Sequence, residues 1–220
     1  MITAVYKALG DVLSPELRAV LWKSLGLTIV LFVGVLIVAE VLILTLTQLS
    51  WPWADWMLGL GTGLILAVGF VFLIGPVMAA FAGLFLDEVA AKVESRHYPA
   101  HRPGVPLSGV RAIIMGLQFA SVVLLVNLAI LPMVLLGFGA LVLVAANAYL
   151  ISREYFDMIA MRHLPLSDAQ QLRRENGMMV LLAGVVPALL ALIPLLNLFV
   201  PLFATAYFVH FFKQVQASST

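Results

Sequence analysis

The chain has 220 residues, of which 63% are hydrophobic and only 10% are charged, and its mean hydropathy is +1.11. A soluble domain of ordinary composition has about 25% charged residues, so lipid must form part of the solvent of this chain. The net charge of +1 gives no indication of a nucleic-acid partner, and the lack of cysteine excludes disulfides, iron–sulfur clusters and thiolate zinc sites. The composition predicts an all-α integral membrane protein.

Residues 1–24 mix charged and apolar positions, and they lack the continuous apolar core of a cleavable signal peptide. Their apolar side chains recur at helical spacing, at Ile2, Val5, Tyr6, Leu9 and Leu13. This pattern predicts a short helix that lies on the membrane surface. We expect the first membrane span to serve as its own insertion signal.

The first apolar block covers 25–86 and is interrupted by a tryptophan-rich segment at 50–56. Its two arms, 25–49 and 57–86, each exceed the roughly 20 apolar residues that a transmembrane helix needs. Indole rings favour the lipid–water interface, so the interruption is typical of a turn at the membrane surface. The block therefore predicts a transmembrane hairpin.

The second and third apolar blocks, 112–151 and 178–212, are shorter. Pro132 divides the second block into arms of about 20 residues, which are just long enough to span. In the third block, the arm after Pro201 has about 11 residues and would cover only about 17 Å of a roughly 30 Å hydrocarbon layer. We expect this hairpin to be re-entrant and to pack against other helices or another subunit.

Two charged segments between the blocks predict further helices. The first is expected at 87–98, and Pro99 ends it because the residue before a proline disfavours the helical conformation. In the second segment, 152–177, Pro165 breaks the helix. An S-x-x-Q pattern that begins at Ser167 then predicts a capping box and a new helix.

The positions of the basic residues predict the topology. None of the twelve lies at a presumed hairpin tip, and all lie before, between or after the apolar blocks. By the positive-inside rule these flanks are cytoplasmic, so we expect a multi-pass protein of an inner membrane with both termini inside. The twelve are Lys7, Arg18, Lys23, Lys92, Arg96, Arg102, Arg111, Arg153, Arg162, Arg173, Arg174 and Lys213.

We expect one membrane domain over 1–220. Its parts are an interfacial helix at 1–24, a transmembrane hairpin at 25–86, a cytoplasmic segment at 87–111, a second hairpin at 112–151, cytoplasmic helices at 152–177, a third, re-entrant hairpin at 178–213 and a tail at 214–220.

The start of the first span has features of an anion site. Ser14 precedes a proline and is a good N-cap, and the first helical turn after it has free N–H groups, that of Leu17 among them. Arg18 adds a permanent charge with several donors, and Lys23 follows one and a half turns later. The alternative is that both basic residues only mark the cytoplasmic boundary of the span, and Glu16 would repel an anion.

Glu40 is the ionisable residue that lies well inside a predicted span. A charge at that depth costs at least about 2.5 kcal/mol unless it is paired or faces water. Glu40 is therefore a candidate for proton coupling or pore lining, and the alternative is placement at the outer interface. Asn197 could line the same path or form a hydrogen bond between helices.

The remaining polar residues do not predict an enzyme, a metal site or a cofactor. His97 and His101 are four residues apart, but Pro99 stands between them, so they do not share a helical face. The crowded charges around Glu154 and Arg162 indicate structural ion pairing. The sequence shows no nucleophile motif, phosphate-binding glycine loop or metal-ligand spacing.

Four stretches, in this order, are similar to those of a known family. They are Leu13-Ser14-Pro15-Glu16-Leu17-Arg18, the segment from Gly75-Pro76 through Asp87-Glu88 to Tyr98-Pro99, Asn147-Ala148-Tyr149-Leu150-Ile151-Ser152-Arg153-Glu154-Tyr155-Phe156, and Ile193-Pro194-Leu195-Leu196-Asn197-Leu198-Phe199-Val200-Pro201. On these residues the chain resembles the CysZ sulfate permease family and its broader group of bacterial membrane proteins.

The resemblance implies two long transmembrane helices plus two shorter, partly penetrating helical hairpins, assembled into symmetric homo-oligomers. It also implies inward passage of sulfate to supply cysteine biosynthesis, with two adjacent arginines at the sulfate site. Arg18 matches the first of these arginines, but the second position is Ala19, which removes one bidentate donor.

Our hypothesis is a cofactor-free inner-membrane permease or channel for sulfate or a related small oxyanion, held by Ser14, Leu17, Arg18 and Lys23. The alternative is a non-transporting membrane scaffold or assembly factor that acts through 87–111 and 152–176.

Overall fold

The computed structural model describes residues 1–46, 59–61, 63–64, 85–106, 139–197 and 199–218, together with short pieces between 114 and 132. The regular secondary structure in these ranges is entirely helical, which confirms the all-α prediction for them. The tryptophan-rich turn at 50–56 and most of the predicted second span lie outside the described residues. The second long transmembrane helix therefore stays a prediction.

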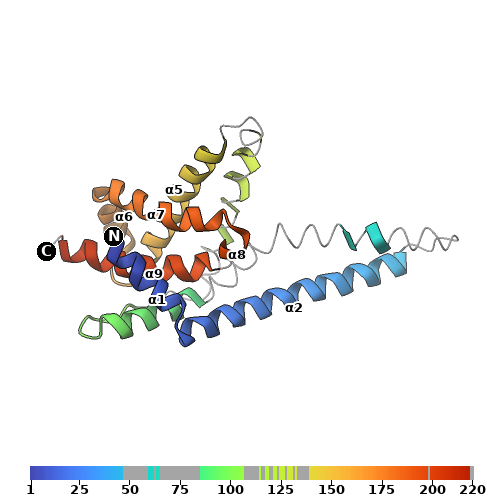
Figure 1. The fold of residues 1–220 in the computed structure, drawn as a ribbon, viewed down its shortest axis with the longest axis horizontal. Coiled ribbons are helices and arrows are strands. Elements are labelled where there is room, and N and C mark those ends of the chain that lie inside the picture. The colour runs from blue at the N-terminus through green and yellow to red at the C-terminus, as the bar shows by residue number, and fades with distance from the viewer. Residues whose placement is uncertain are drawn as a thin grey trace.

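The long helix α2 (Pro15–Leu46) extends away from the other helices as a single rod (Figure 1). Its Pro15–Ala39 part is long and apolar enough to cross a membrane, and only 12% of its most apolar window is buried within the chain. A helix that is apolar on all sides and unburied needs lipid or another protein around it. Among the described residues it is the one straight helix of this kind. Helices α6 and α7 pass the same test only together, although they meet at 90°.

The N-terminal helix α1 (Ile2–Val12) forms where the sequence predicts it, but it packs through its small residues. Ala4 and Ala8 are fully buried, because α1 lies against α9. The bulky Ile2, Tyr6 and Leu13 are instead 76%, 73% and 70% exposed. An outward row of large apolar side chains beside a membrane span fits the predicted position on the membrane surface.

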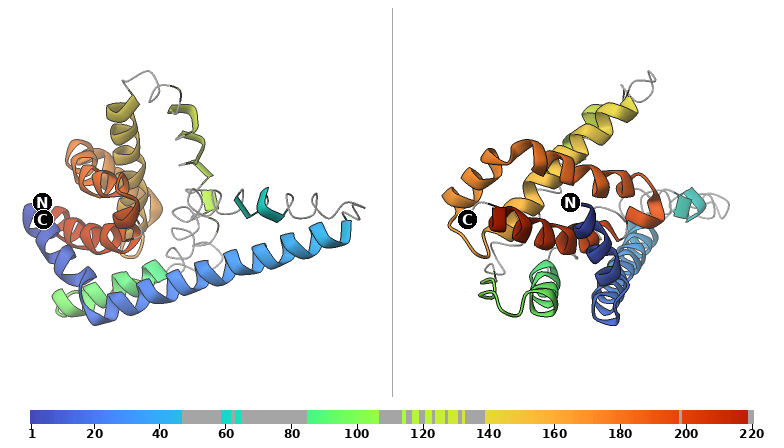
Figure 2. Two further views of the ribbon diagram at one scale, coloured as in Figure 1. Left: turned by 45° about the vertical axis from the view of Figure 1, so that its right-hand side comes forward. Right: turned by 60° about the vertical axis from the view of Figure 1, so that its left-hand side comes forward.

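The core is formed by α5 (Gly139–Ala160), α7 (Gly177–Ala191) and α9 (Val200–Ser218), with α5 packed against both of the others. Figure 2 shows α9 running between α1 and the α5–α7 pair. Almost every residue of α9 is buried, including Phe203, Tyr207 and Phe212. This explains its sequence, since a helix that is apolar all round is normally an interior helix.

The connections of the C-terminal half differ in one detail from the sequence prediction. Helix α6 (Leu166–Glu175) does begin after Pro165, but Ser167 lies inside it and donates to Asp168, so the predicted capping box is wrong. The extended backbone of Pro165 at the N-cap position already starts the helix two residues earlier. Helix α8 (Pro194–Asn197) forms the predicted turn of the third hairpin.

Helix α9 continues through Ser218, so residues 214–218 belong to it rather than to a separate tail. The reason is packing, because Lys213 and Val215 remain buried beyond the apolar block. The ammonium group of Met1 donates to Oε1 of Gln214 at 3.0 Å, so the two ends of the chain lie side by side (Figure 2). Their common side of the membrane stays a prediction.

A close approach between α5 and α7 depends on a glycine. A Cβ atom added at Gly184 of α7 would lie 2.1 Å from the carbonyl oxygen of Ala148 and 2.7 Å from Cβ of Ser152, both on α5. The first of these is backbone and cannot move without separating the two helices.

We therefore expect Gly184→Ala to lower the free energy of unfolding by about 1–3 kcal/mol through overpacking. Thermal unfolding in detergent would measure the effect. The matched control is Gly10→Ala in α1, where no described atom lies within 4 Å of the added methyl group. Alanine is the better helix former, so this control should be neutral or stabilising. Equal melting temperatures for the two variants would contradict the packing explanation.

Candidate functional site

The junction between α1 and α2 has the N-cap that the sequence predicts. The N–H of Ser14 donates to the carbonyl of Asp11 at 2.8 Å, which ends α1. The Oγ of Ser14 accepts from the N–H of Leu17 at 3.4 Å, in the first turn of α2. Both Ser14 and Leu17 are buried, at 6% and 3% exposure. The cap therefore fixes the start of the long helix against the rest of the chain.

The two predicted basic ligands lie on the outside of α2. Arg18 and Lys23 are exposed. They are five residues apart, so their directions differ by about 140° around the helix. The structure thus does not gather the four residues around one point. The N-cap faces inward, and the charges face outward.

The helix at 85–97 brings further charges to the same end of α2. The Nζ of Lys92 is bonded to Oε1 of Glu88 at 2.7 Å, and this contact lowers the pKa of the Glu88 carboxyl. Lys23 lies close enough to Glu88 to contribute to the same shift. Lys92 and Arg96 are one turn apart and both act electrostatically on Glu16. Sequence reasoning missed these two residues, although their spacing places them on one helix face.

Glu16 interacts with the same groups that would hold an anion. Its carboxylate interacts with the Ser14 hydroxyl and with its own backbone N–H, at the first turn of α2. A carboxylate at a helix N-terminus is electrostatically favourable for the same reason that a bound anion is. A free anion at this turn would therefore compete with Glu16.

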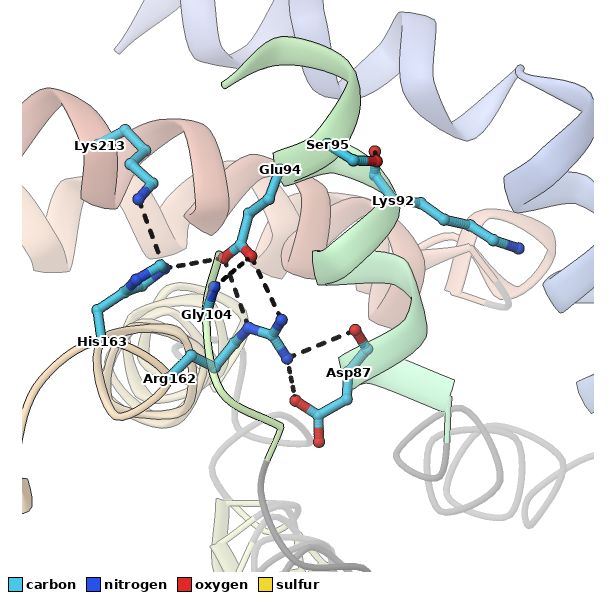
Figure 3. A network of polar contacts seen from close by, with 8 residues as sticks. All are labelled: Asp87, Lys92, Glu94, Ser95, Gly104, Arg162, His163 and Lys213. Atoms are coloured by element: carbon cyan, nitrogen blue, oxygen red, sulfur yellow. Dashed lines mark hydrogen bonds and ion pairs between the residues drawn. The ribbon is translucent and has the colours of Figure 1, made fainter. Parts of the chain in front are cut away.

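A buried network of charges connects the helix at 85–97 to α5 and α9 (Figure 3). Arg162, in the turn that follows α5, bonds Asp87 through Nη1 and Oε2 of Glu94 through Nη2, the latter at 3.3 Å. Glu94 also bonds Nε2 of His163 at 2.9 Å and accepts from the N–H of Gly104 at 3.1 Å. The prediction of structural ion pairing is right for Arg162, but its partners are Asp87 and Glu94.

The environment of Glu94 favours its charged form. Burial alone would raise the pKa of its carboxyl, but the bonds from His163, Arg162 and Gly104 outweigh burial and lower the pKa from 4.5 to about 2. Lys213 of α9 lies 3.5 Å from His163 and extends the network. These contacts hold the helix at 85–97 in place, and those of Glu94 are strongest while its carboxyl is ionised.

We expect Glu94→Gln to lower the free energy of unfolding at pH 7 by about 3 kcal/mol, because it removes one of the two carboxylates that pair with the buried Arg162 charge. The native pKa is depressed, so the stabilisation from Glu94 is complete above pH 4.5 and is lost as the pH falls toward 2. The free energy of unfolding, measured between pH 7 and pH 3, should therefore fall more steeply with pH for the parent than for the variant. Glu175→Gln, at an exposed site on α6, is the control and should change little. A Glu94→Gln protein as stable as the parent would contradict this assignment.

A second polar cluster joins α1, the helix at 85–97 and α9. Asp11 is 2% exposed and bonds Nε2 of His97 at 2.8 Å and Nε2 of His210 at 2.9 Å. Burial raises the pKa of the Asp11 carboxyl, but the bonds from His210 and His97 lower it more, so the net shift is downward. The Nδ1 of His210 is bonded to the hydroxyl of Tyr98 at 2.8 Å. Sequence reasoning compared His97 only with His101 and so missed this cluster.

The two predicted pore residues lie on different elements, Glu40 on α2 and Asn197 on α8. Glu40 is 26 residues after Ser14 on the same helix, a distance of about 39 Å along its axis, and its side chain is outside the description. Asn197 ends α8, is half-buried, and donates its N–H to Ile193 at 2.8 Å. Their predicted roles stay predictions.

The comparisons with known proteins agree with the sequence resemblance. A family model described as "Sulfate transporter CysZ/Etoposide-induced protein 2.4" matches residues 4–201. No curated protein matches the chain. The family match includes α1, α2, α5, α6, α7 and α8 and ends where α9 begins. Since it covers most of the chain, this protein belongs to the family of sulfate transporter CysZ and etoposide-induced protein 2.4.

Proposed function

We propose that the protein is an inner-membrane permease or channel for sulfate or a related small oxyanion, which supplies sulfate for cysteine biosynthesis. The observation that carries this proposal is the family match over residues 4–201, whose description names a sulfate transporter. The apolar, largely unburied α2 supports the membrane location.

The proposed anion site is the first turn of α2. Ser14 fixes this turn, and Arg18 supplies a charged donor beside it. Lys23, Lys92 and Arg96 add positive charge from α2 and the helix at 85–97. Glu16, Glu88 and the Asp11 carboxylate that pairs with Arg96 oppose these four basic groups, so the local net charge is +1. A divalent oxyanion suits such a field.

Calorimetric titration with sulfate tests the site. Arg18→Ala removes a charged donor and should weaken binding by about tenfold or more. Glu16→Gln removes the carboxylate that competes for the same turn and should strengthen binding. Arg174→Ala changes an exposed basic residue on α6 by the same net charge and should have no effect. Equal affinities of the parent and Arg18→Ala would eliminate this site.

The assembly is proposed to be a homo-oligomer, because α2 buries little surface within its own chain. The outward Arg18 and Lys23 would then face lipid headgroups, solvent or another subunit. Glu40 is proposed, secondarily, to couple transport to protons, since an ionisable group inside a span is expensive without a function.

Uptake of radiolabelled sulfate into proteoliposomes tests transport itself. We expect uptake above that of empty vesicles, reduced in Arg18→Ala and unchanged in Arg174→Ala. An imposed pH gradient should change the rate for the parent but not for Glu40→Gln if Glu40 is the coupling group. If no sulfate enters the vesicles, the permease proposal fails and the scaffold alternative is favoured.

A further inference from the structure

The cluster of Asp11, His97 and His210 brings three potential metal ligands close together. One potential ligand atom from each residue lies within 4.8 Å of the others. The residues come from α1, from the last turn of the helix at 85–97 and from α9, so the fold brings them together across most of the chain. Asp11 and His210 are buried, and the His97 side chain is 24% exposed.

We propose that these three residues bind a divalent transition-metal ion of the Zn²⁺ or Co²⁺ class. Two imidazole nitrogens and one carboxylate form a ligand set that such ions accept, with remaining positions open to water. Both imidazoles direct Nε2 toward the same carboxylate, so the donors converge. Mg²⁺ and Ca²⁺ prefer oxygen ligands and are not suited to a site in which two of three donors are nitrogen.

A residue outside the ligand set fixes the orientation of one ligand. The Tyr98 hydroxyl lies 2.8 Å from Nδ1 of His210, on the side of the ring opposite Nε2. Partners of this kind hold the ring and the tautomer of a metal-binding histidine. The His97 and His210 rings meet edge to face, with centroids 4.8 Å apart, and the Nε2 atoms of both rings lie against the Asp11 carboxylate. The ligands are thus held in place by packing as well as by Asp11.

Arg96 is the group that opposes a bound cation. Its Nη1 lies 3.6 Å from Oδ1 of Asp11 and supplies positive charge to the cluster. The Arg96 side chain is 56% exposed, so it can turn into solvent without leaving a buried charge. Metal binding and the Arg96 contact therefore compete for one carboxylate, and removal of Arg96 should strengthen metal binding.

The position of the site gives the ion a structural consequence. Asp11 lies three residues before Ser14, so an ion held by Asp11 would fix the end of α1 and the start of α2 against α9. This inference does not depend on the proposed transport function, and its test does not use sulfate.

The experiment uses the purified full-length protein without a histidine tag. Titration with Co²⁺ should produce the visible absorption of a bound ion at one ion per chain, and Zn²⁺ should displace it. Asp11→Asn and His97→Ala should each weaken binding by at least about tenfold, and Arg96→Ala should strengthen it. The matched control His101→Ala, at an exposed histidine beside Tyr98, should bind as the parent does. Mg²⁺ should produce no heat in calorimetry.

Two results would overturn the proposal. One is the absence of Co²⁺ and Zn²⁺ binding by the folded parent protein. The other is Co²⁺ binding by His97→Ala that equals the parent, because His97 is partly exposed and this variant should fold even where Asp11→Asn does not. Circular dichroism would establish that each variant is folded before titration.

Discussion

The buried ion pair between Arg162 and Glu94 positions the helix at 85–97, and much of the remaining structure depends on that helix. Their side chains are 1% and 6% exposed, so both charges need partners within the chain. The same helix directs Lys92 and Arg96 toward α2 and His97 toward Asp11. One buried contact thus fixes both the charges around the start of the long helix and the polar cluster beneath α1.

Helix α9 links the two buried clusters, although nearly all of it lies beyond the residues that the family model matches. His210 belongs to one cluster and Lys213 to the other, and both are held within an aromatic interior of Phe203, Phe208 and Phe212. Polar groups in such an interior must find partners within the chain. Burial by the apolar helix α9 therefore strengthens the polar contacts of Asp11 and Glu94.

The structural features that could be predicted from the sequence are those that depend on residues close together in the chain. The helix of α1, the N-cap at Ser14, the break at Pro165 and the turn before α9 all follow from rules that act over a few residues. The clusters do not follow from such rules, because 86 residues separate Asp11 from His97 and 68 separate Glu94 from Arg162. The sequence shows that Lys92 and Arg96 are one helical turn apart, but it does not show that their helix lies beside α2. The capping box at Ser167 shows that a local motif can also fail where a preceding proline already starts the helix.

The arrangement of α2 limits how one chain could conduct an ion. Ser14 and Leu17 face the packed interior, whereas Arg18 and Lys23 face outward in different directions. An anion drawn to Arg18 would therefore approach from the outer side of α2 and not through the core, where the polar groups of Asp11 and Glu94 are already engaged with their own partners. On the proposed function, a path that continues from Arg18 along α2 has apolar surface on this chain for most of its length. Other polar groups must come from the second helix of the predicted hairpin or from another subunit, which is the physical reason to place the proposed conduction path at an interface of α2.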